Sequence, residues 1–130
     1  MSSTVRSALR ILVADDNRDA AMALAMLLDR LGFQVIATEF DGESALARIR
    51  KEGPHVAILD IALPEMDGCE VARQVREELS DPPHLVALTG LGSPSDRSDA
   101  LEAGFESYFV KPVDSHRLEE LLLGFLPSTE

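Results

Sequence analysis

The segment Val56-Ala-Ile-Leu-Asp60 (VAILD) decides the fold of this chain. Its first four residues are apolar and leave no polar face, which is typical of a strand in a parallel sheet that helices cover on both sides. Two further runs, ILVA at 11–14 and LVAL at 85–88, have the same character. We therefore expect a buried parallel sheet, with a carboxylate placed directly after one of its strands.

Outward from these runs, short apolar segments alternate with longer stretches of helical periodicity. The strands predicted in this way are 10–14, 34–37, 56–59, 85–88 and 107–110. Helix ends are indicated by Gly32, Gly53 and Gly104, and helix starts by Asp67, Ser93 and Asp114. The pattern predicts an α/β fold of the (βα)₅ type, a doubly wound parallel sheet of five strands.

Length, composition and charge narrow the class of protein. The chain has 130 residues, of which 45% are hydrophobic, and this suits one globular domain. We see neither a secretory signal nor an apolar run long enough to cross a bilayer, so we expect no membrane contact and a cytoplasmic location. The net charge of −11 argues against direct binding to nucleic acid. Cys69 is the single cysteine, which excludes an internal disulfide.

Polar residues follow four of the predicted strands. They are Asp15, Asp16, Asp60, Thr89 and the pair Lys111-Pro112. Taken singly, each has an ordinary explanation as a helix cap, a strand end or a surface residue. The carboxyl ends of parallel strands meet at one rim, however, and carboxylates crowded there repel one another unless a cation neutralises them. Oxygen ligands of this kind suit Mg²⁺.

Three histidines could suggest a different metal, but their positions do not support one. His55 and His84 lie near strand starts, and His116 lies on a predicted helix. None of them is expected at the rim, so a transition-metal site is not predicted.

Four motifs together carry a resemblance to a known family. They are LVADDN at 12–17, LDIALPEMDG at 59–68, ALTG at 87–90 and YFVKPVD at 108–114. Their order, spacing and strand-end positions resemble those of response-regulator receiver domains of two-component signalling, the CheY-like superfamily, with most similarity to receivers of hybrid histidine kinases. The resemblance implies a flavodoxin-like sheet of order 2-1-3-4-5. It covers a receiver domain at 9–126, flanked by a flexible segment at 1–8 and a tail at 127–130.

The resemblance also implies a role for each residue at the rim. Asp60 is expected to be the phosphoacceptor, with Asp16 as a direct Mg²⁺ ligand, Asp15 as a ligand through water, and the backbone carbonyl of Ala62 as a further ligand. The Thr89 hydroxyl would hydrogen-bond the phosphoryl group and the Lys111 ammonium would pair with it. Pro112 is expected to follow a cis peptide bond that shapes its loop. Tyr108 matches an aromatic switch that turns inward as Thr89 moves, unless its hydroxyl simply stays in water at the rim.

The function implied is Mg²⁺-dependent phosphoryl transfer from a sensor histidine kinase or a histidine phosphotransfer protein to Asp60, which switches a protein-interaction surface. The target would be a downstream protein or attached domains of a larger protein, and phosphorylation could produce a homodimer. Such a protein is not an enzyme in the usual sense, because it catalyses only its own phosphorylation and slow autodephosphorylation. Ala62 and Leu91 flank the expected phosphoryl position and are apolar, so neither can hold a water in line and we predict slow hydrolysis.

Other classes fit less well. A haloacid-dehalogenase-like phosphatase needs an acid two residues after its nucleophile, where this chain has Ala62. A flavodoxin-like cofactor binder needs a phosphate loop where this chain has Asp15 and Asp16. A degenerate receiver that only binds would not need all the site residues. A stand-alone receiver and a receiver within a larger protein both remain open.

Overall fold

The runs that were expected to be strands form one parallel sheet. The computed structural model describes residues 2–90 and 92–126, and the sheet has the order β2-β1-β3-β4-β5. Its strands are β1 (Arg10–Ala14), β2 (Gln34–Glu39), β3 (Val56–Asp60), β4 (His84–Thr89) and β5 (Ser107–Val110). All neighbouring strands are parallel. The predicted fold and strand order are therefore confirmed.

Three strands extend further than the sequence pattern predicted. β2 continues to Glu39, β3 includes Asp60, and β4 runs from His84 to Thr89. The cause is pairing between neighbours, because the ladder places Asp60 opposite Leu88 in β4 and Thr89 is likewise paired with β5. Asp60 and Thr89 are thus the last residues of paired strands, and their backbones are held by the sheet.

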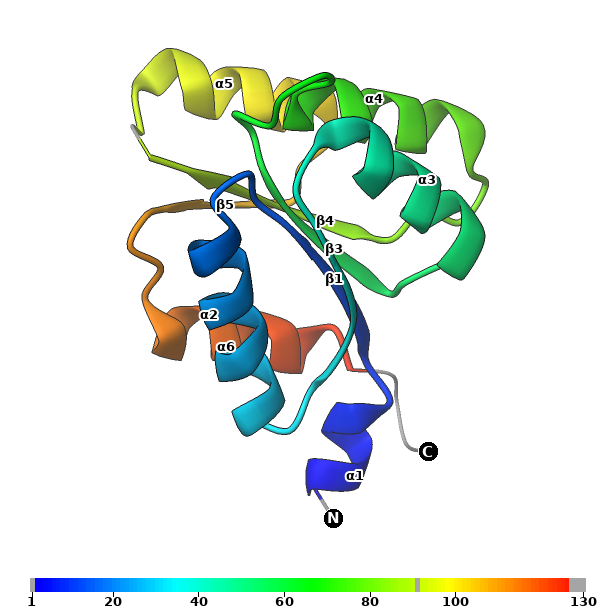
Figure 1. Ribbon diagram of the computed structural model, residues 1–130, viewed down its shortest axis with the longest axis vertical. Coiled ribbons are helices and arrows are strands. Elements are labelled where there is room, and N and C mark those ends of the chain that lie inside the picture. The colour runs from blue at the N-terminus through cyan, green and yellow to red at the C-terminus, as the bar shows by residue number, and fades with distance from the viewer. Residues whose placement is uncertain (1, 91, 127–130) are drawn as a thin grey trace.

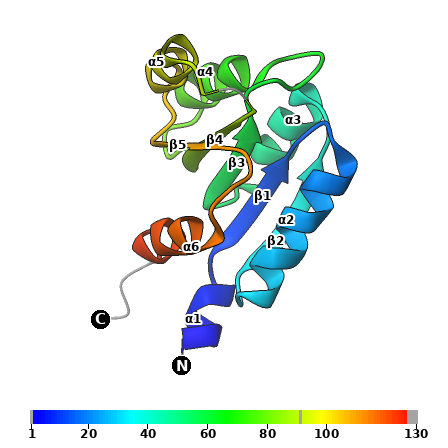
Figure 2. The same cartoon turned by 90° about the vertical axis from the view of Figure 1, so that its left-hand side faces the viewer.

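Five helices cover the two faces of the sheet. They are α2 (Arg18–Arg30), α3 (Gly42–Glu52), α4 (Gly68–Glu78), α5 (Pro94–Ala103) and α6 (Ser115–Gly124). α3, α4 and α5 lie on one face, and α2 and α6 lie on the other (Figure 1, Figure 2). The predicted caps are present: the side chains of Asp67, Ser93 and Asp114 accept backbone N–H groups at the starts of α4, α5 and α6.

The core consists of two apolar layers, one on each face. Alternate residues of β3 divide between them: Ala57 and Leu59 pack toward α3, α4 and α5, whereas Val56 and Ile58 pack toward α2 and α6. All four side chains are fully buried. The continuous apolar run of β3 therefore reflects burial on both sides.

The N-terminal segment contains a helix that the sequence pattern did not predict. This helix, α1 (Ser2–Ser7), lies within residues 1–8, whose flexibility stays a prediction. Arg6 holds this helix against the rest of the domain. Its guanidinium donates to the Leu31 carbonyl at 2.8 Å and to Glu119 at 2.7 Å, and lies 5.3 Å from the centre of the Phe33 ring. These contacts attach α1 to the C-terminal end of α2 and to the middle of α6. The predicted tail at 127–130 lies outside the described residues.

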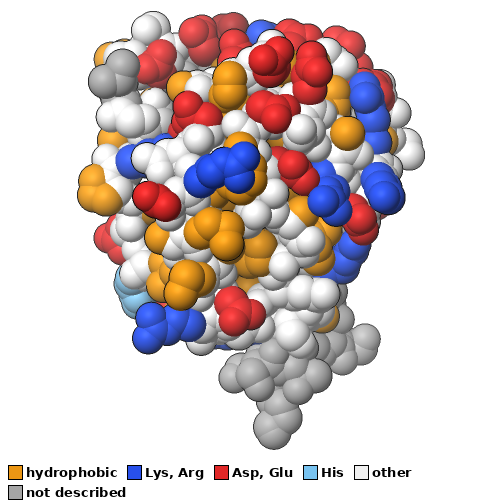
Figure 3. Space-filling model, in the orientation of Figure 1, with side chains coloured by type: hydrophobic (Ala, Val, Ile, Leu, Met, Phe, Trp, Pro, Cys, Tyr) orange, Lys and Arg blue, Asp and Glu red, His pale blue; other side chains and the backbone are white. Residues whose placement is uncertain are grey.

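The surface carries the acidic excess of the sequence. In the space-filling view, acidic side chains gather along the upper part of the molecule (Figure 3). Within residues 2–90 and 92–126, no helix has both the length and the apolar character that crossing a membrane requires.

Candidate functional site

The carboxyl edge of the sheet brings the predicted rim residues together. Asp15 follows β1 directly, and its N–H donates to the Glu39 carbonyl at 3.1 Å. Lys111 follows β5, and its N–H donates to the Thr89 carbonyl at 2.7 Å. With Asp60 at the end of β3, the site residues are fixed by backbone hydrogen bonds between strands. The site is therefore rigid at its base.

Lys111 joins the two buried carboxylates of the site. Its Nζ donates to Asp15 Oδ2 and to Asp60 Oδ2, both at 2.6 Å. Asp15 and Asp60 are only 2% and 4% exposed, so these ion pairs are largely shielded from water. Partial burial tends to lower the pKa of Lys111, but the hydrogen bonds to both carboxylates outweigh it and raise the pKa above its ordinary value of 10.5. Lys111 is therefore a firmly charged group at neutral pH.

The remaining oxygen of each buried carboxylate accepts a backbone N–H. Asp15 Oδ1 accepts from Asn17 at 3.0 Å, and Asp60 Oδ1 accepts from Ala62 at 2.8 Å. Each carboxylate is thus held at both oxygens and cannot rotate freely. Asn17, which was not predicted to belong to the site, also caps α2 through its side chain.

The chemistry of the donor set fits a magnesium ion. Carboxylate oxygens of Asp15, Asp16 and Asp60 lie within 4.8 Å of one another, and Asp16 is exposed whereas the other two are buried. Three carboxylates and the Lys111 ammonium leave a formal charge of −2, which a divalent cation would neutralise. Mg²⁺ prefers oxygen ligands and retains water, which an exposed rim can supply. The predicted role of the Ala62 carbonyl remains a prediction, and what the structure shows of Ala62 is its N–H bond to Asp60.

The two residues expected to act as a switch, Thr89 and Tyr108, lie on the neighbouring strands β4 and β5. Thr89 is 3% exposed at the end of β4. Tyr108 lies on β5 and packs against the core layer that α3, α4 and α5 cover. Its hydroxyl is buried and finds no hydrogen-bond partner within residues 2–90 and 92–126. The alternative in which this hydroxyl stays in water is therefore wrong. The peptide bond between Lys111 and Pro112 is cis, as predicted, whereas Leu91 lies outside the described residues.

The histidines lie away from the rim, as expected. His55 precedes β3 at the opposite end of the sheet, and its Nδ1 accepts the Arg10 N–H at 3.0 Å. His84 begins β4 and stacks on Phe125 with 3.9 Å between ring centres. His116 lies on α6.

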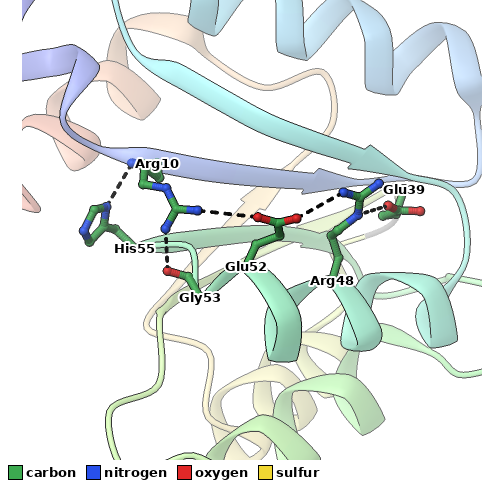
Figure 4. A network of polar contacts seen from close by, with 6 residues as sticks. All are labelled: Arg10, Glu39, Arg48, Glu52, Gly53 and His55. Atoms are coloured by element: carbon green, nitrogen blue, oxygen red, sulfur yellow. Dashed lines mark hydrogen bonds and ion pairs between the residues drawn. The ribbon is translucent and has the colours of Figure 1, made fainter.

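A network of ion pairs runs from that opposite end back to the site. Arg10 contacts Glu52, which contacts Arg48, and the Arg48 Nε donates to Glu39 at 2.9 Å (Figure 4). The backbone carbonyl of Glu39 accepts the Asp15 N–H. Exposed pairs of this kind contribute little free energy singly, but together they hold α3 beside the end of β2.

Comparisons with a family model and with individual relatives indicate the same family. The family model of the response regulator receiver domain matches residues 11–123. The response regulator MprA of Mycolicibacterium vanbaalenii is 42% identical over 113 residues, which are 87% of this chain and 47% of that protein. The transcriptional regulatory protein TrcR of Mycobacterium tuberculosis is 38% identical over 120 residues, 92% of this chain and 46% of that protein. The chain spans about half the length of the curated relatives it matches.

A solved structure with the same fold is described with a magnesium ion. It is the receiver domain of the sensor histidine kinase PA1611 from Pseudomonas aeruginosa, described with a magnesium ion coordinated in the active site cleft. It superimposes with a TM-score of 0.82 at 26% identity, covering 92% of this chain and 98% of that chain.

Proposed function

Because the chain belongs to the family of response regulator receiver domains, we propose that it accepts a phosphoryl group on Asp60 in a Mg²⁺-dependent reaction. The observation that carries the proposal is the placement of Asp60 itself. It is buried at a strand end, oriented by the Ala62 N–H, paired with Lys111, and within reach of two further carboxylates. A carboxylate held in this way is suited to attack phosphorus rather than to cap a helix.

The residues divide the chemistry between them. An Asp60 oxygen forms a bond to phosphorus while the bond from phosphorus to the donor breaks, and the donor leaves with the electron pair of that bond. The Ala62 N–H holds Oδ1, which leaves Oδ2, the oxygen beside Lys111, as the nucleophile. The Lys111 ammonium then pairs with the transferred group, and the Thr89 hydroxyl donates to it.

Mg²⁺ would be held by Asp15, Asp16 and Asp60, with the Ala62 carbonyl as a further ligand and water linking Asp15. When bound, the ion supplies positive charge near the phosphoryl oxygens as negative charge develops on them. The other contributions, orientation and hydrogen bonding, come from the side chains of the chain itself.

The phosphoryl donor we propose is a histidine of a sensor kinase or of a histidine phosphotransfer protein. An apolar groove beside the site supports a protein donor. It is lined by Ala23, Leu24, Leu27, Pro112 and Val113, together with Asp15 and Lys111. We expect a partner that brings a side chain to Asp60 to cover this groove, because Asp15 and Lys111 line it, and the apolar lining favours an apolar surface around the partner's histidine.

Phosphorylation would be relayed to a protein-interaction surface through Thr89 and Tyr108. The Thr89 hydroxyl would turn toward the phosphoryl group, and the inward position of Tyr108 would be favoured in response. The output is a downstream protein, attached domains of a longer chain, or a homodimer. We place this signalling in the cytoplasm, with no catalysis beyond the protein's own phosphorylation and slow dephosphorylation.

The test uses a small acyl-phosphate donor with the purified protein and detects the adduct by mass spectrometry. We expect a gain of one phosphoryl group in the wild type with Mg²⁺, and none after chelation or in Asp60→Ala. Asp81→Ala is the matched control, because Asp81 is exposed between α4 and β4, at the end of the sheet opposite the carboxylate cluster, and this variant should remain labelled. Labelling of Asp60→Ala, or equal labelling without metal, would contradict the proposal. Steady turnover of phosphomonoesters would instead indicate a phosphatase.

A further inference from the structure

Two helices of the protein begin with the same pair of residues. Asp41-Gly42 starts α3, and Asp67-Gly68 starts α4. In each pair the aspartate caps the helix with its side chain and the glycine is the first helical residue. Both glycines contact the backbone of the loop 61–67, which leads from Asp60 to α4. Neither has a left-handed backbone, so turn geometry does not explain why glycine is present.

Gly68 lies against the chain directly after Asp60. Its N–H donates to the Ile61 carbonyl at 3.1 Å. A Cβ atom at this position would lie 2.8 Å from Ile61 Cα, closer than real side chains approach. The start of α4 therefore packs directly against the first residue of the loop.

Gly42 contacts the same loop further along, at Pro64 and Met66, although it belongs to a different helix. Its N–H donates to the Pro64 carbonyl at 3.1 Å, and a Cβ atom here would overlap the Met66 carbonyl group, with 2.6 Å to the carbonyl carbon. These are backbone atoms, which cannot rotate aside as a side chain can. The loop also has little room to move, since Met66 N–H donates to Pro64 at 2.8 Å and Leu63 is 5% exposed in the core.

We propose that Gly42 is a positioning residue for the phosphoryl-acceptor site. Because it has no side chain, the start of α3 can press against the loop backbone and hold it where the Ala62 N–H reaches Asp60 Oδ1 at 2.8 Å. Pro64, which Gly42 contacts, is only two positions from Ala62. A methyl group at residue 42 must displace this backbone, and a misplacement of about 1 Å near reacting groups can cost on the order of 100-fold in rate. The inference rests on the proposed transfer to Asp60.

The first test compares Gly42→Ala with Gly53→Ala, a control at the other end of α3. Gly53 has a φ of 59°, and a Cβ atom added there would have no neighbour within 4 Å, so alanine costs stability through backbone strain alone. At a temperature where both variants are folded, we expect Gly42→Ala to be labelled about 10- to 100-fold more slowly than wild type. Gly53→Ala should keep the wild-type rate. Equal rates in the two variants would overturn the inference.

The second test uses the wild-type protein alone. Native-state amide exchange of the wild type should show the Gly42 and Ala62 N–H groups opening together, with the same dependence on denaturant, because both bonds break when the loop lifts. Fast exchange of Ala62 beside a protected Gly42 would overturn the inference. Failure of the wild type to be labelled at all would remove the proposed function, but would leave this exchange result intact.

Discussion

Replacing Tyr108 with phenylalanine should make the protein more stable. The Tyr108 hydroxyl is buried without a hydrogen-bond partner in the described part of the chain, while the ring packs against the core layer of α3, α4 and α5. An unsatisfied buried polar group costs about 1–3 kcal/mol. Because the residue as a whole is only partly buried, we take the low end, about 1 kcal/mol. Tyr108→Phe keeps the ring and removes that cost.

Thermal unfolding followed by circular dichroism measures the effect. For a chain of 130 residues, a gain of this size should raise Tm by roughly 3–5 °C. Thr38→Val is the control, because its hydroxyl donates weakly to the Met22 sulfur at 3.9 Å and is not a buried orphan. That variant should stay within about 0.5 kcal/mol of wild type. A lower Tm for Tyr108→Phe, or a shift no larger than the control's, would refute the assignment of an unsatisfied hydroxyl.

The remaining predictions concern the metal, the lifetime of the adduct and the response to pH. Asp16→Asn should weaken Mg²⁺ binding by at least about tenfold in calorimetry, with an unchanged Tm. Ala62→Asn should speed loss of the phosphoryl group about 10- to 100-fold, because the new side chain can hold a water in line; an unchanged half-life would show that water positioning is not limiting. The hydrogen bond from Arg50 lowers the pKa of Glu78 below 4.5. Its stabilisation is present above that value and is lost as pH falls through the lowered pKa. In Arg50→Ala, a carboxyl NMR titration should find the pKa raised toward 4.5.

The rim of the site was predictable because it depends only on the apolar pattern of the strands and on the order of strands and helices along the chain. Asp60 and Thr89 end runs that are apolar on both faces, and parallel strands leave their carboxyl ends at one edge. What the sequence could not show is how the side chains meet there. Lys111 is separated from Asp15 by 96 positions and from Asp60 by 51, so its bridge between them depends on the packed structure.

Close contacts that form only because a residue has no side chain are the hardest to predict from sequence. Gly42 looks like any residue at a helix start, and only the assembled loop shows that a Cβ atom would meet a backbone carbonyl. A signal was present, since Asp-Gly begins both α3 and α4, but capping alone explains only the aspartate. The helix α1 was not predicted because its contacts, from Arg6 to Leu31 and Glu119, join distant parts of the chain, and a local sequence pattern does not show such contacts.

The charge of the site suggests an order for its reactions. Asp15, Asp16 and Asp60 with Lys111 sum to −2, and the two buried carboxylates are shielded from the water that would otherwise screen them. A phosphoryl donor is itself an anion, so the side chains alone repel it. Lys111 cannot remove this repulsion, because its single charge is already shared between Asp15 and Asp60. A divalent cation bound first would neutralise the cluster and free the ammonium to pair with the incoming group. The proposed dependence on Mg²⁺ is therefore what the protein's own charges lead us to expect, and labelling should rise with metal occupancy rather than with donor concentration alone.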